Sequence, residues 1–489
     1  GKALTNGDND KVSLKTINGK KYAFDDEGKM LYGWVDDASA ERLDNTDGDG
    51  FKDADYYFGG EDDGAMTTGW LQIDITYDEA INNDYKYTAA AFNDDEDQTR
   101  WFYFKSNGKM IKSDEGDRTK DKTINGKKYA FDQYGAMVAE WSLDSDDEKE
   151  ASDNVGHYAA STNQTVASVS EAWQGKGNYA QYSKAWKYFN SVEDGARVSK
   201  GWFKVVPAEY LNEGKYDDDE DFWYYADGSG NLYAGEFKTI KGKKYAFRND
   251  GRMLTGLKFI LEDDDNDNLT VYADDDTPNF DNEEDFLDNA VAFYEPGGYK
   301  CYYFGGGDDG AMRTNKTTVE IDGENHNFYF EKSGSKKGAG VTGEKDDKLY
   351  QSGMLLKADS DDKYVVVDKT TKYTTNAAGE KVLDYVTYNK LDDAKEFMAQ
   401  DDVLESNTPV DADGKIDLGN NNKKKAEDIS EAYTIGYKEY ASSDMTTHEY
   451  FLVNTSGKVI DNRGKNKDGS DYYYVTDNSG KITNIYVED

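Results

Sequence analysis

Short strands rich in aromatic residues recur along the chain, each followed by an acidic turn that contains glycine. The clearest copy, residues 17–24, returns nearly unchanged at 124–131 and 240–247. Successive side chains of a strand point to opposite faces, so Tyr22 and Phe24 share one face. The Asp, Asn and Gly residues of the turn supply the positive φ angles that a tight hairpin requires. The repeat is therefore predicted to be an aromatic β-hairpin.

Two further types of aromatic run lie between these copies. From the last aromatic residue to the turn glycine there are four positions in the first type, as from Phe24 to Gly28, and six in the second, as from Phe58 to Gly64. Copies of the second type end at Phe58, Phe189 and Phe304, and copies of the third type include residues 101–104, 222–225 and 328–330. Three hairpins thus form a triplet that is used about three times up to residue 340.

Six of the nine methionines stand two residues after a turn glycine. They are Met30, Met66, Met110, Met137, Met253 and Met312. This fixed place predicts an apolar slot in which a flexible thioether fills the gap between neighbouring hairpins. An isolated hairpin is only marginally stable in water, so the hairpins must stack. We expect a mainly β fold, a stacked β-hairpin repeat solenoid with acidic loop or short-helix insertions.

The repeat pattern is clear in the first part of the chain and weaker after it, and this change predicts the domain organisation. Residues 1–340 are expected to hold tandem aromatic β-hairpin repeats in three triplets, and residues 341–489 degenerate repeats with an insertion at about 384–447. Acidic insertions, expected to be surface loops or short helices, lie at 36–53, 72–98, 143–184, 204–220 and 258–298. The degenerate copies lie near Leu349, Tyr450 and Tyr472, with helical character expected from Leu391 to Met398.

Composition narrows the classes of partner. The 489 residues include 58 Lys+Arg and 99 Asp+Glu, a formal charge of −41, together with 39 Tyr and 14% aromatic residues. Acidic disordered chains are poor in aromatic residues, so this chain is expected to fold. Its charge repels phosphate backbones, which argues against nucleic acid as a partner. No segment approaches the length of about 20 apolar residues that spans a bilayer, so membrane insertion is not expected.

A Gly-Trp pair follows several of the turns, as at Trp34, Trp70 and Trp202. With the polar spacer, aromatic triplet, glycine turn and apolar residue, this order resembles the bacterial cell-wall-binding repeat family, which includes choline-binding modules, glucan-binding repeats and clostridial toxin repetitive domains. The resemblance is clearest at residues 15–34 and 54–70. It implies an extracellular protein, secreted or at the surface of a Gram-positive cell, that attaches to choline-bearing teichoic acids, α-glucans or host glycans.

Choline-binding modules of this family hold a quaternary ammonium in a cage of aromatic rings. Lys21, Lys128 and Lys244 stand at the position that would complete the aromatic strand of the first hairpin type, so complete cages are expected to be a minority. The candidate ligand-binding pairs are Trp34 with Tyr57, Trp70 with Tyr103, and Trp202 with Tyr224. The alternative is that these rings only pack one hairpin on the next.

Oxygen-bearing side chains alternate along residues 45–53, with Asn45, Asp47, Asp49 and Asp53 as candidate metal ligands. The pattern matches the first half of a calcium-binding loop, but a tyrosine stands where that loop would end in a bidentate glutamate. Calcium is therefore a candidate cofactor, and an ordinary acidic turn is the alternative.

Catalysis has little support in the sequence, and no catalytic residue is assigned. His157, His326 and His448 lack the spacing of a metal site or of a nucleophile with its base, and Cys301 is expected to pack within its aromatic run. We expect a non-catalytic surface-associated protein whose repeats bind a cell-wall polymer or glycan. Two alternatives stay open: an adhesin that binds a host protein through its loop insertions, and the non-catalytic part of a larger secreted enzyme.

Overall fold

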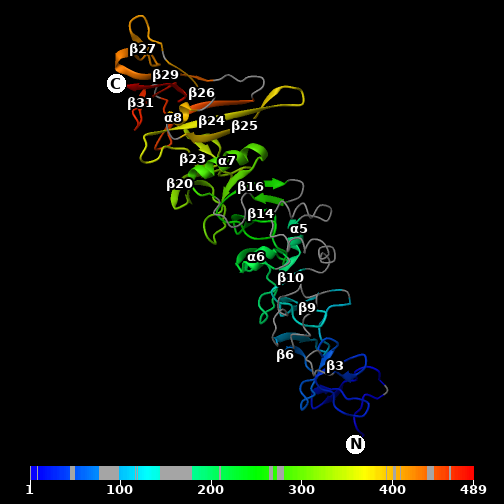
Figure 1. Ribbon diagram of the computed structural model, residues 1–489. Coiled ribbons are helices and arrows are strands. Elements are labelled where there is room, and N and C mark those ends of the chain that lie inside the picture. Colours follow the sequence, from blue (N-terminus) through cyan, green and yellow to red (C-terminus); the bar gives the residue numbers. More distant parts are fainter. Residues whose placement is uncertain are drawn as a thin grey trace. The chain divides into compact units, whose positions relative to one another are not determined.

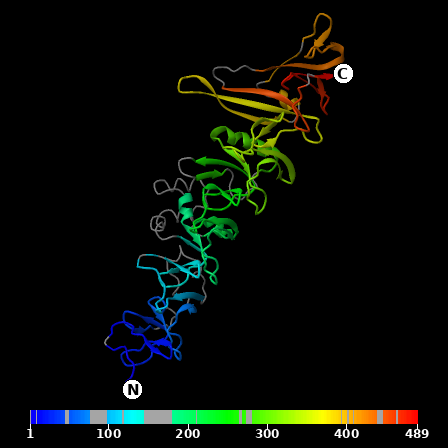
Figure 2. The same ribbon diagram turned by 180° about the vertical axis from the view of Figure 1, so that it is seen from behind.

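The chain forms two units, each with its own internal contacts. The computed structural model describes residues 2–7, 9–43, 50–75, 98–115, 117, 119–143, 179–208, 211–263, 268–271, 280–391, 394–399, 403–407, 409–437, 445–461 and 464–489. Unit 1 comprises Gly1–Lys238, Ala246–Met253 and Asp264–Asn268, and unit 2 comprises Thr239–Tyr245, Leu254–Asp263 and Leu269–Asp489. Figures 1 and 2 show their elements from opposite sides.

Unit 1 is a series of antiparallel hairpins, so the predicted mainly β, hairpin-repeat fold class is confirmed. Hairpins 1 to 6 are β1 (Lys15–Ile17) with β2 (Lys20–Tyr22), β3 (Trp34–Asp36) with β5 (Tyr56–Tyr57), β6 (Gly69–Ile75) with β7 (Gln98–Phe104), β8 (Thr119–Ile124) with β9 (Lys127–Asp132), β10 (Trp141–Leu143) with β11 (Trp186–Tyr188), and β12 (Gly201–Val205) with β13 (Phe222–Ala226). β4 (Glu41–Arg42) adds to β3. Hairpin 7 is β14 (Glu236–Ile240) with β15 (Lys243–Phe247), and its residues Thr239–Tyr245 belong to unit 2.

The tight turn of each first-type hairpin precedes the aromatic strand, whereas the sequence pattern placed it after that strand. In hairpin 4, Asn125 and Gly126 have φ angles of 50° and 81° and connect β8 to β9. Two successive positive φ angles belong to the two-residue turn that Asn-Gly favours. The acidic turn that follows makes a smaller closure, in which Phe131 forms a single bridge with Met137. The aromatic strand therefore has a pairing partner along each of its edges.

In hairpins 4 and 6, the aspartate that opens the acidic turn fixes the shape of that turn. The Oδ1 atom of Asp132 accepts backbone hydrogen bonds from Tyr134 at 2.8 Å and from Ala136 at 2.9 Å. Asp227 makes the equivalent pair of bonds in hairpin 6. Because a short acceptor side chain satisfies two backbone donors locally, these aspartates contribute to folding as well as to the net charge.

Five of the six methionines of the predicted slot pack against a turn glycine of the next hairpin. A Cβ atom built on Gly64 would clash with the Sδ atom of Met30. The same relation holds for Gly108 with Met66, Gly135 with Met110, Gly195 with Met137 and, in unit 2, Gly338 with Met312. The backbone N–H of Met66 also donates to the carbonyl oxygen of Lys21 in the preceding hairpin at 2.9 Å. The predicted slot is confirmed, and it explains the glycine, because no side chain fits there.

Several of the predicted insertions contain short helices. These are α5 (Tyr179–Lys184) and α6 (Glu213–Asp217) in unit 1 and α7 (Glu283–Gly297) in unit 2. The side chain of Asn282 caps α7 by accepting from the backbone N–H of Asp285 at 2.8 Å, and Gly298 ends it with a φ angle of 71°. In the part of the chain that the structure describes, no helix is long and apolar enough to cross a membrane.

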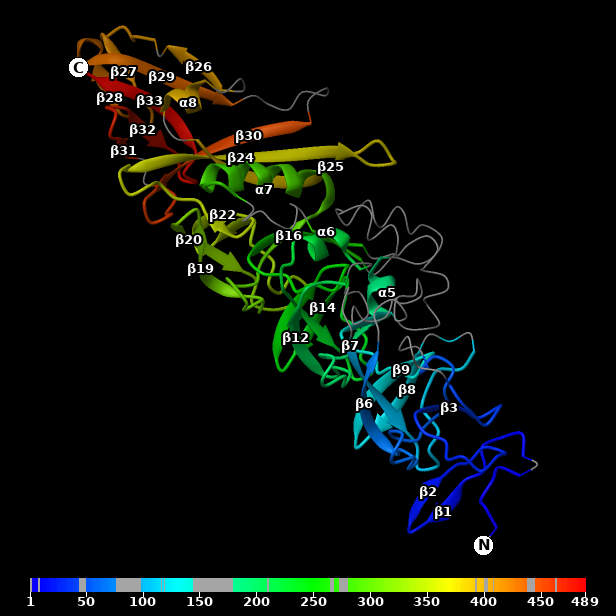
Figure 3. The same cartoon turned by 60° about the horizontal axis from the view of Figure 1, so that its bottom comes forward.

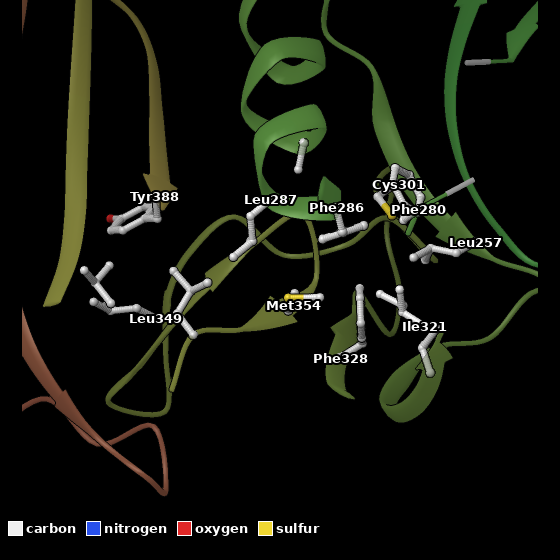
Figure 4. Packing of buried hydrophobic residues seen from close by; sticks show 14 of the residues in the cluster. Leu257, Phe280, Phe286, Leu287, Cys301, Ile321, Phe328, Leu349, Met354 and Tyr388 are labelled. Atoms are coloured by element: carbon white, nitrogen blue, oxygen red, sulfur yellow. The ribbon is translucent and has the colours of Figure 1, made fainter. Parts of the chain in front are cut away.

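Unit 2 begins with two hairpin sheets built around α7. β16 (Leu257–Asp263) lies between β17 (Asn268–Val271) and β18 (Lys300–Tyr303), and a five-stranded sheet has the order β19-β20-β23-β22-β21. Its strands are β19 (Asn315–Ile321), β20 (Glu324–Phe330), β21 (Gly343–Lys345), β22 (Lys348–Gln351) and β23 (Met354–Leu355). Figure 4 shows Phe286 and Leu287 of α7 directed into a core that includes Cys301, Phe328 and Met354. The helix gives these strands a thicker core than a hairpin stack provides.

Two further sheets complete unit 2. β24 (Tyr364–Thr375) lies between β25 (Lys381–Leu391) and β30 (Thr446–Asn454), and Figure 3 shows how far β24 and β25 extend together. The other sheet has the order β26-β29-β33-β32-β31. Its strands are β26 (Val403–Asn407), β29 (Ile429–Tyr437), β33 (Ile482–Glu488), β32 (Tyr473–Thr476) and β31 (Lys465–Lys467), with β27 (Lys415–Asp417), β28 (Lys423–Lys425), η3 (Ala426–Asp428) and α8 (Ala394–Met398) beside them. The last of these helices agrees with the helical character expected near Met398.

The degenerate copy predicted near Tyr450 keeps the shape of the turn, without its acidic residues, but loses the hairpin. The Oδ1 atom of Asn454 accepts from the backbone of Ser456 and Lys458, both at 3.0 Å, as the aspartates of unit 1 do. The strand before this turn, however, pairs with β24, with Tyr450 opposite Asp368. The division at residue 340, the insertion at 384–447 and the grouping into triplets stay predictions.

Candidate aromatic binding sites

Four aromatic rings meet where hairpins 3 and 4 stack. Trp70 on β6 lies opposite Tyr103 on β7, with ring centroids 5.1 Å apart and planes at 73°. Trp101 lies 6.3 Å from Trp70 at 89°, and Tyr129 of hairpin 4 lies 4.9 Å from it at 67°. We name these four rings the Trp70 cluster. Trp70, Trp101 and Tyr103 are half-buried, so a ligand can reach them.

The pairing of β6 and β7 places these side chains on one face. Residues two apart on a strand, and residues opposite each other on paired strands, share a face. Trp101 and Tyr103 are two apart, Tyr103 is opposite Trp70, and Gln72 is opposite Trp101. Beneath them lies a buried apolar group to which Ile111 belongs. The local strand geometry therefore builds three of the four rings, and stacking supplies the fourth.

A carboxylate from hairpin 5 lies at the edge of the Trp70 cluster. Glu193, in the long turn 190–195, accepts a hydrogen bond from Nε1 of Trp101 at 3.3 Å and another from Nε2 of Gln72 at 3.3 Å. Glu193 is exposed. The cluster thus combines ring faces with a negative charge, and both attract an organic cation.

Hairpin 6 repeats the geometry of the three rings that hairpin 3 contributes. Trp202 lies opposite Tyr225 at 5.1 Å and 78°, and it lies 6.4 Å from Trp223 at 88°. Phe247 lies 5.7 Å from Trp202. We name Trp202, Trp223, Tyr225 and Phe247 the Trp202 cluster. Its first three rings are half-buried, although Tyr233 stacks on Tyr225 at 5.1 Å.

The predicted pairing of Trp202 with Tyr224 is wrong by one residue. Trp202 faces Tyr225, whereas Tyr224 is fully buried and opposite Phe203. The ring of Tyr224 lies 5.0 Å from Trp141 and 5.5 Å from Phe203. Four aromatic residues in succession hid the register, because any of them could belong to either face.

Counting back from the turn glycine would have identified Tyr225 as the partner of Trp202. Tyr103 precedes Gly108 by 108 − 103 = 5 positions, and Tyr225 precedes Gly230 by 230 − 225 = 5. The tryptophan two residues earlier then falls on the same face, which identifies Trp101 in one hairpin and its counterpart in the other. No comparable signal pointed to Glu193, because it lies two hairpins away from the ring that it contacts.

The equivalent rings of hairpin 5 are closed to solvent. Trp141 lies 5.2 Å from Tyr188 and 6.3 Å from Trp186, and both tryptophans are buried. Phe203 stacks on Tyr188 at 4.9 Å, and Nε1 of Trp141 donates to the carbonyl oxygen of Val206 at 2.8 Å. Burial raises the pKa of Tyr188 to about 12. These rings form a packing core.

Trp34 and Tyr57 are brought together as predicted, but the tryptophan is covered. Their ring centroids lie 4.9 Å apart at 61°. Trp34 is only 2% exposed, with Phe51 at 6.4 Å and Phe102 at 5.2 Å. At this position the alternative interpretation, packing of one hairpin on the next, describes the tryptophan ring. A ligand-binding role for any of the six predicted residues stays a prediction.

In unit 2, the hairpin of β19 and β20 has a lysine where a tryptophan would stand. Tyr329 lies opposite Lys316. The Nζ atom of Lys345 lies 4.3 Å from the centre of the Tyr329 ring and 3.6 Å from the carboxylate of Glu331. An ammonium group of the chain itself thus covers a ring at the position equivalent to Tyr103.

Most of the predicted calcium ligands lie outside the described residues. This applies to Asn45, Asp47 and Asp49, and Asp53 is exposed. Among the residues that the structure describes, no group of three or more His, Cys, Asp or Glu side chains could hold a metal ion. Calcium binding stays a prediction.

Two of the histidines lie close to carboxylates, and the cysteine is buried. The Nδ1 atom of His326 lies 3.6 Å from Glu283, and that of His448 lies 2.9 Å from Asp368. His157 lies outside the described residues. Cys301 is buried, and burial raises the pKa of its thiol well above the ordinary value. Its place in the core agrees with the predicted packing role.

Comparison with known proteins finds no matching family model and no matching curated protein. Among solved structures, CbpJ from Streptococcus pneumoniae is similar at 17% identity and a TM-score of 0.26, over 71% of this chain and 93% of that chain. The modular autolysin LytC from the same organism is similar at 16% identity and a TM-score of 0.29, over 72% of this chain and 50% of that chain. Choline binding protein F from Streptococcus pneumoniae is similar at 18% identity and a TM-score of 0.19, over 71% of this chain and 99% of that chain.

Proposed function

We propose that this chain is a non-catalytic, extracellular binding protein that attaches to a cell-wall polymer or glycan through the Trp70 and Trp202 clusters. One observation carries the proposal: a half-buried tryptophan is held edge-on by rings of its own hairpin and contacts a ring of the next hairpin. This arrangement occurs at Trp70 and again at Trp202. The sequence resemblance to cell-wall-binding repeats supports the same class of ligand.

The angles between the rings favour a quaternary ammonium over a sugar ring. The planes of Tyr103, Trp101 and Tyr129 make angles of 73°, 89° and 67° with that of Trp70. Rings set at such angles present faces and edges to a small volume, as a trimethylammonium group requires, whereas a sugar stacks on one flat face. Choline-bearing teichoic acid is therefore the preferred ligand, ahead of α-glucan and host glycan.

Weak sites suffice for attachment to a polymer. Each cluster is small, so its affinity for a single head group is expected to be low. A polymer that carries many head groups can engage both clusters, and the second contact then benefits from a high effective concentration. The two clusters are thus expected to act together on the wall and separately on free choline.

Titration with free choline and with α-glucan oligosaccharides, followed by tryptophan fluorescence, tests the ligand. Trp70→Ala and Trp202→Ala should each remove part of the choline response, and the double variant should no longer sediment with choline-bearing cell walls. Trp141→Phe, in the closed core of hairpin 5, is the matched control and should sediment normally. Undiminished sedimentation of the folded double variant would refute the proposal.

A further inference from the structure

We propose that Glu193 sets the charge preference of the Trp70 cluster, so that the complete site consists of three consecutive hairpins. Hairpin 3 provides Trp70, Trp101 and Tyr103, hairpin 4 provides Tyr129, and hairpin 5 provides the carboxylate. This inference rests on the proposed function, because it concerns the ligand of the same cluster.

The carboxylate is held in place by two donors on the ligand-facing side of hairpin 3. Its Oε2 atom accepts from Trp101 and its Oε1 atom from Gln72, each at 3.3 Å. Both donors are neutral, so neither of them cancels the charge. An organic cation resting on the Trp101 ring would therefore lie next to a full negative charge, which a neutral ligand would not use.

No described lysine or arginine neutralises Glu193. Its neighbour Asp194 lies 4.0 Å from Lys127, and the acidic group of Asp121 lies 3.6 Å from Arg197. Among the described residues, no ion pair involves Glu193 itself. The carboxylate that contacts the cluster is thus the one whose charge remains available for a ligand.

The length of the turn explains how Glu193 reaches hairpin 3. The second hairpin type has six positions from its last aromatic residue to the turn glycine, against four in the first type. At the end of this longer turn, Gly195 packs on Met137, and Ala196 is buried in the apolar group beneath the Trp70 cluster. The turn is therefore anchored on the cluster, and its two additional residues project an acid to the edge of the rings. This assigns a binding role to the second-type turn of hairpin 5.

The Trp202 cluster lacks the corresponding hydrogen bond. The Nε1 atom of Trp223, the counterpart of Trp101, is buried and has no hydrogen-bond partner in the described part of the chain. The two clusters thus differ in the group that meets the second tryptophan. An effect of Glu193 should appear at the Trp70 cluster alone.

The test compares choline with its neutral isostere, 3,3-dimethylbutan-1-ol, in the full chain carrying Trp202→Ala, so that the Trp70 cluster gives the response. Glu193→Gln keeps an acceptor for Trp101 and removes only the charge. It should weaken choline binding about fivefold, as loss of one charge interaction at short range in water implies, and leave binding of the alcohol unchanged. Asp194→Asn is the matched control and should alter neither affinity.

Equal losses for both probes, or no loss for either, would overturn the inference, because Glu193 would then only position Trp101 or do nothing. A different result would refute the proposed function. If Trp70→Ala in the same background leaves choline binding unchanged while circular dichroism shows a folded chain, the cluster is not the site. If Glu193→Gln alone has no effect while Trp70→Ala abolishes binding, only the charge assignment is lost.

Discussion

The thioether of Met30 fills the space that a side chain on Gly64 would need. Met30 follows the acidic turn of hairpin 1, and Gly64 ends the acidic turn of hairpin 2 with a φ angle of 60°. Two requirements therefore meet at this glycine: a left-handed backbone and the absence of a Cβ atom. The joint between the hairpins depends on both residues of the pair.

Gly64→Ala should lower the free energy of unfolding by about 2–4 kcal/mol, since it adds backbone strain to a steric clash. Urea unfolding followed by tryptophan fluorescence measures the change. Met30→Ala in the same chain should recover part of the loss, because it removes the clashing atoms and leaves only the strain. Simple additivity of the two substitutions would contradict a direct contact.

Substitutions at two other glycines separate the cost of backbone strain from the cost of the steric clash. Gly19 has a φ angle of 82° but no atom near its would-be Cβ, so Gly19→Ala should cost only the strain, about 1–2 kcal/mol. Gly60 has neither feature, so its alanine variant should change stability by less than about 0.5 kcal/mol. A loss at Gly64 no larger than that at Gly19 would mean that the methionine contributes nothing.

The local features of the fold could be predicted from the sequence because they recur at fixed spacing. The aromatic strands, the turn glycines and the methionine slot each depend on residues within one hairpin or its neighbour. Repetition then showed which positions matter, as with the six methionines that follow a turn glycine. Stacking followed from the instability of a single hairpin.

The accessibility of each cluster could not be predicted, because residues outside the two paired strands of its own hairpin decide it. Trp34 and Trp141 occupy the same place as Trp70, but Phe51 from an insertion covers the first, and Phe203 and the segment at Val206 cover the second. The C-terminal sheets could not be predicted for a related reason. Strand β30 keeps the local turn signal and yet pairs with β24, which lies about 80 residues earlier, and only long-range packing selects that partner.

Alanine substitutions at Trp141 and Trp70 should have different effects, the first mainly on folding stability and the second mainly on choline binding. Trp141→Ala removes a buried indole and should cost about 3–5 kcal/mol of folding free energy. Trp70 is half-buried, so Trp70→Ala should cost less stability while it removes the choline response of its cluster. Thermal unfolding and choline titration of both variants give the comparison. The opposite ranking, with Trp70→Ala the more damaging to stability, would indicate that the Trp70 cluster is a packing core like that of hairpin 5.

In unit 2, Lys390 joins β25 to the first turn of α7. Its Nζ atom lies 2.6 Å from Glu283 and 3.4 Å from Asp359, and its side chain is 9% exposed. Lys390→Met leaves the Glu283 carboxylate, which is only 23% exposed, without its closest cation, and it should cost about 1–3 kcal/mol. Lys369→Met, at a more exposed pair with Glu449, is the control and should cost under about 1 kcal/mol. Denaturant unfolding of unit 2 measures both, and equal costs would argue against a special role for the buried lysine.

Alkaline pH should unfold the hairpin stack because its buried tyrosines resist ionisation. Burial, together with Glu140 and Asp221, raises the pKa of Tyr188 to about 12, whereas an unfolded tyrosine ionises near its ordinary pKa of about 10. Between these pH values the unfolded chain binds fewer protons than the folded chain, so stability falls as pH rises through this range and is unaffected below it. Burial raises the pKa of Tyr302 and Tyr486 in unit 2 to about 12 as well, so both units should be affected.

Tyr188→Phe tests this directly, since it keeps the ring stacked on Phe203 and removes the ionisable hydroxyl group. The variant should unfold at a higher pH than the parent when circular dichroism is followed from pH 9 to 12. Tyr216→Phe, at a tyrosine that is 40% exposed, should leave the alkaline transition in place. Identical transitions for Tyr188→Phe and the parent chain would show that this hydroxyl is already ionised, or already solvated, in the folded protein, and the closed core around Trp141 would then have to be more open than its buried rings indicate.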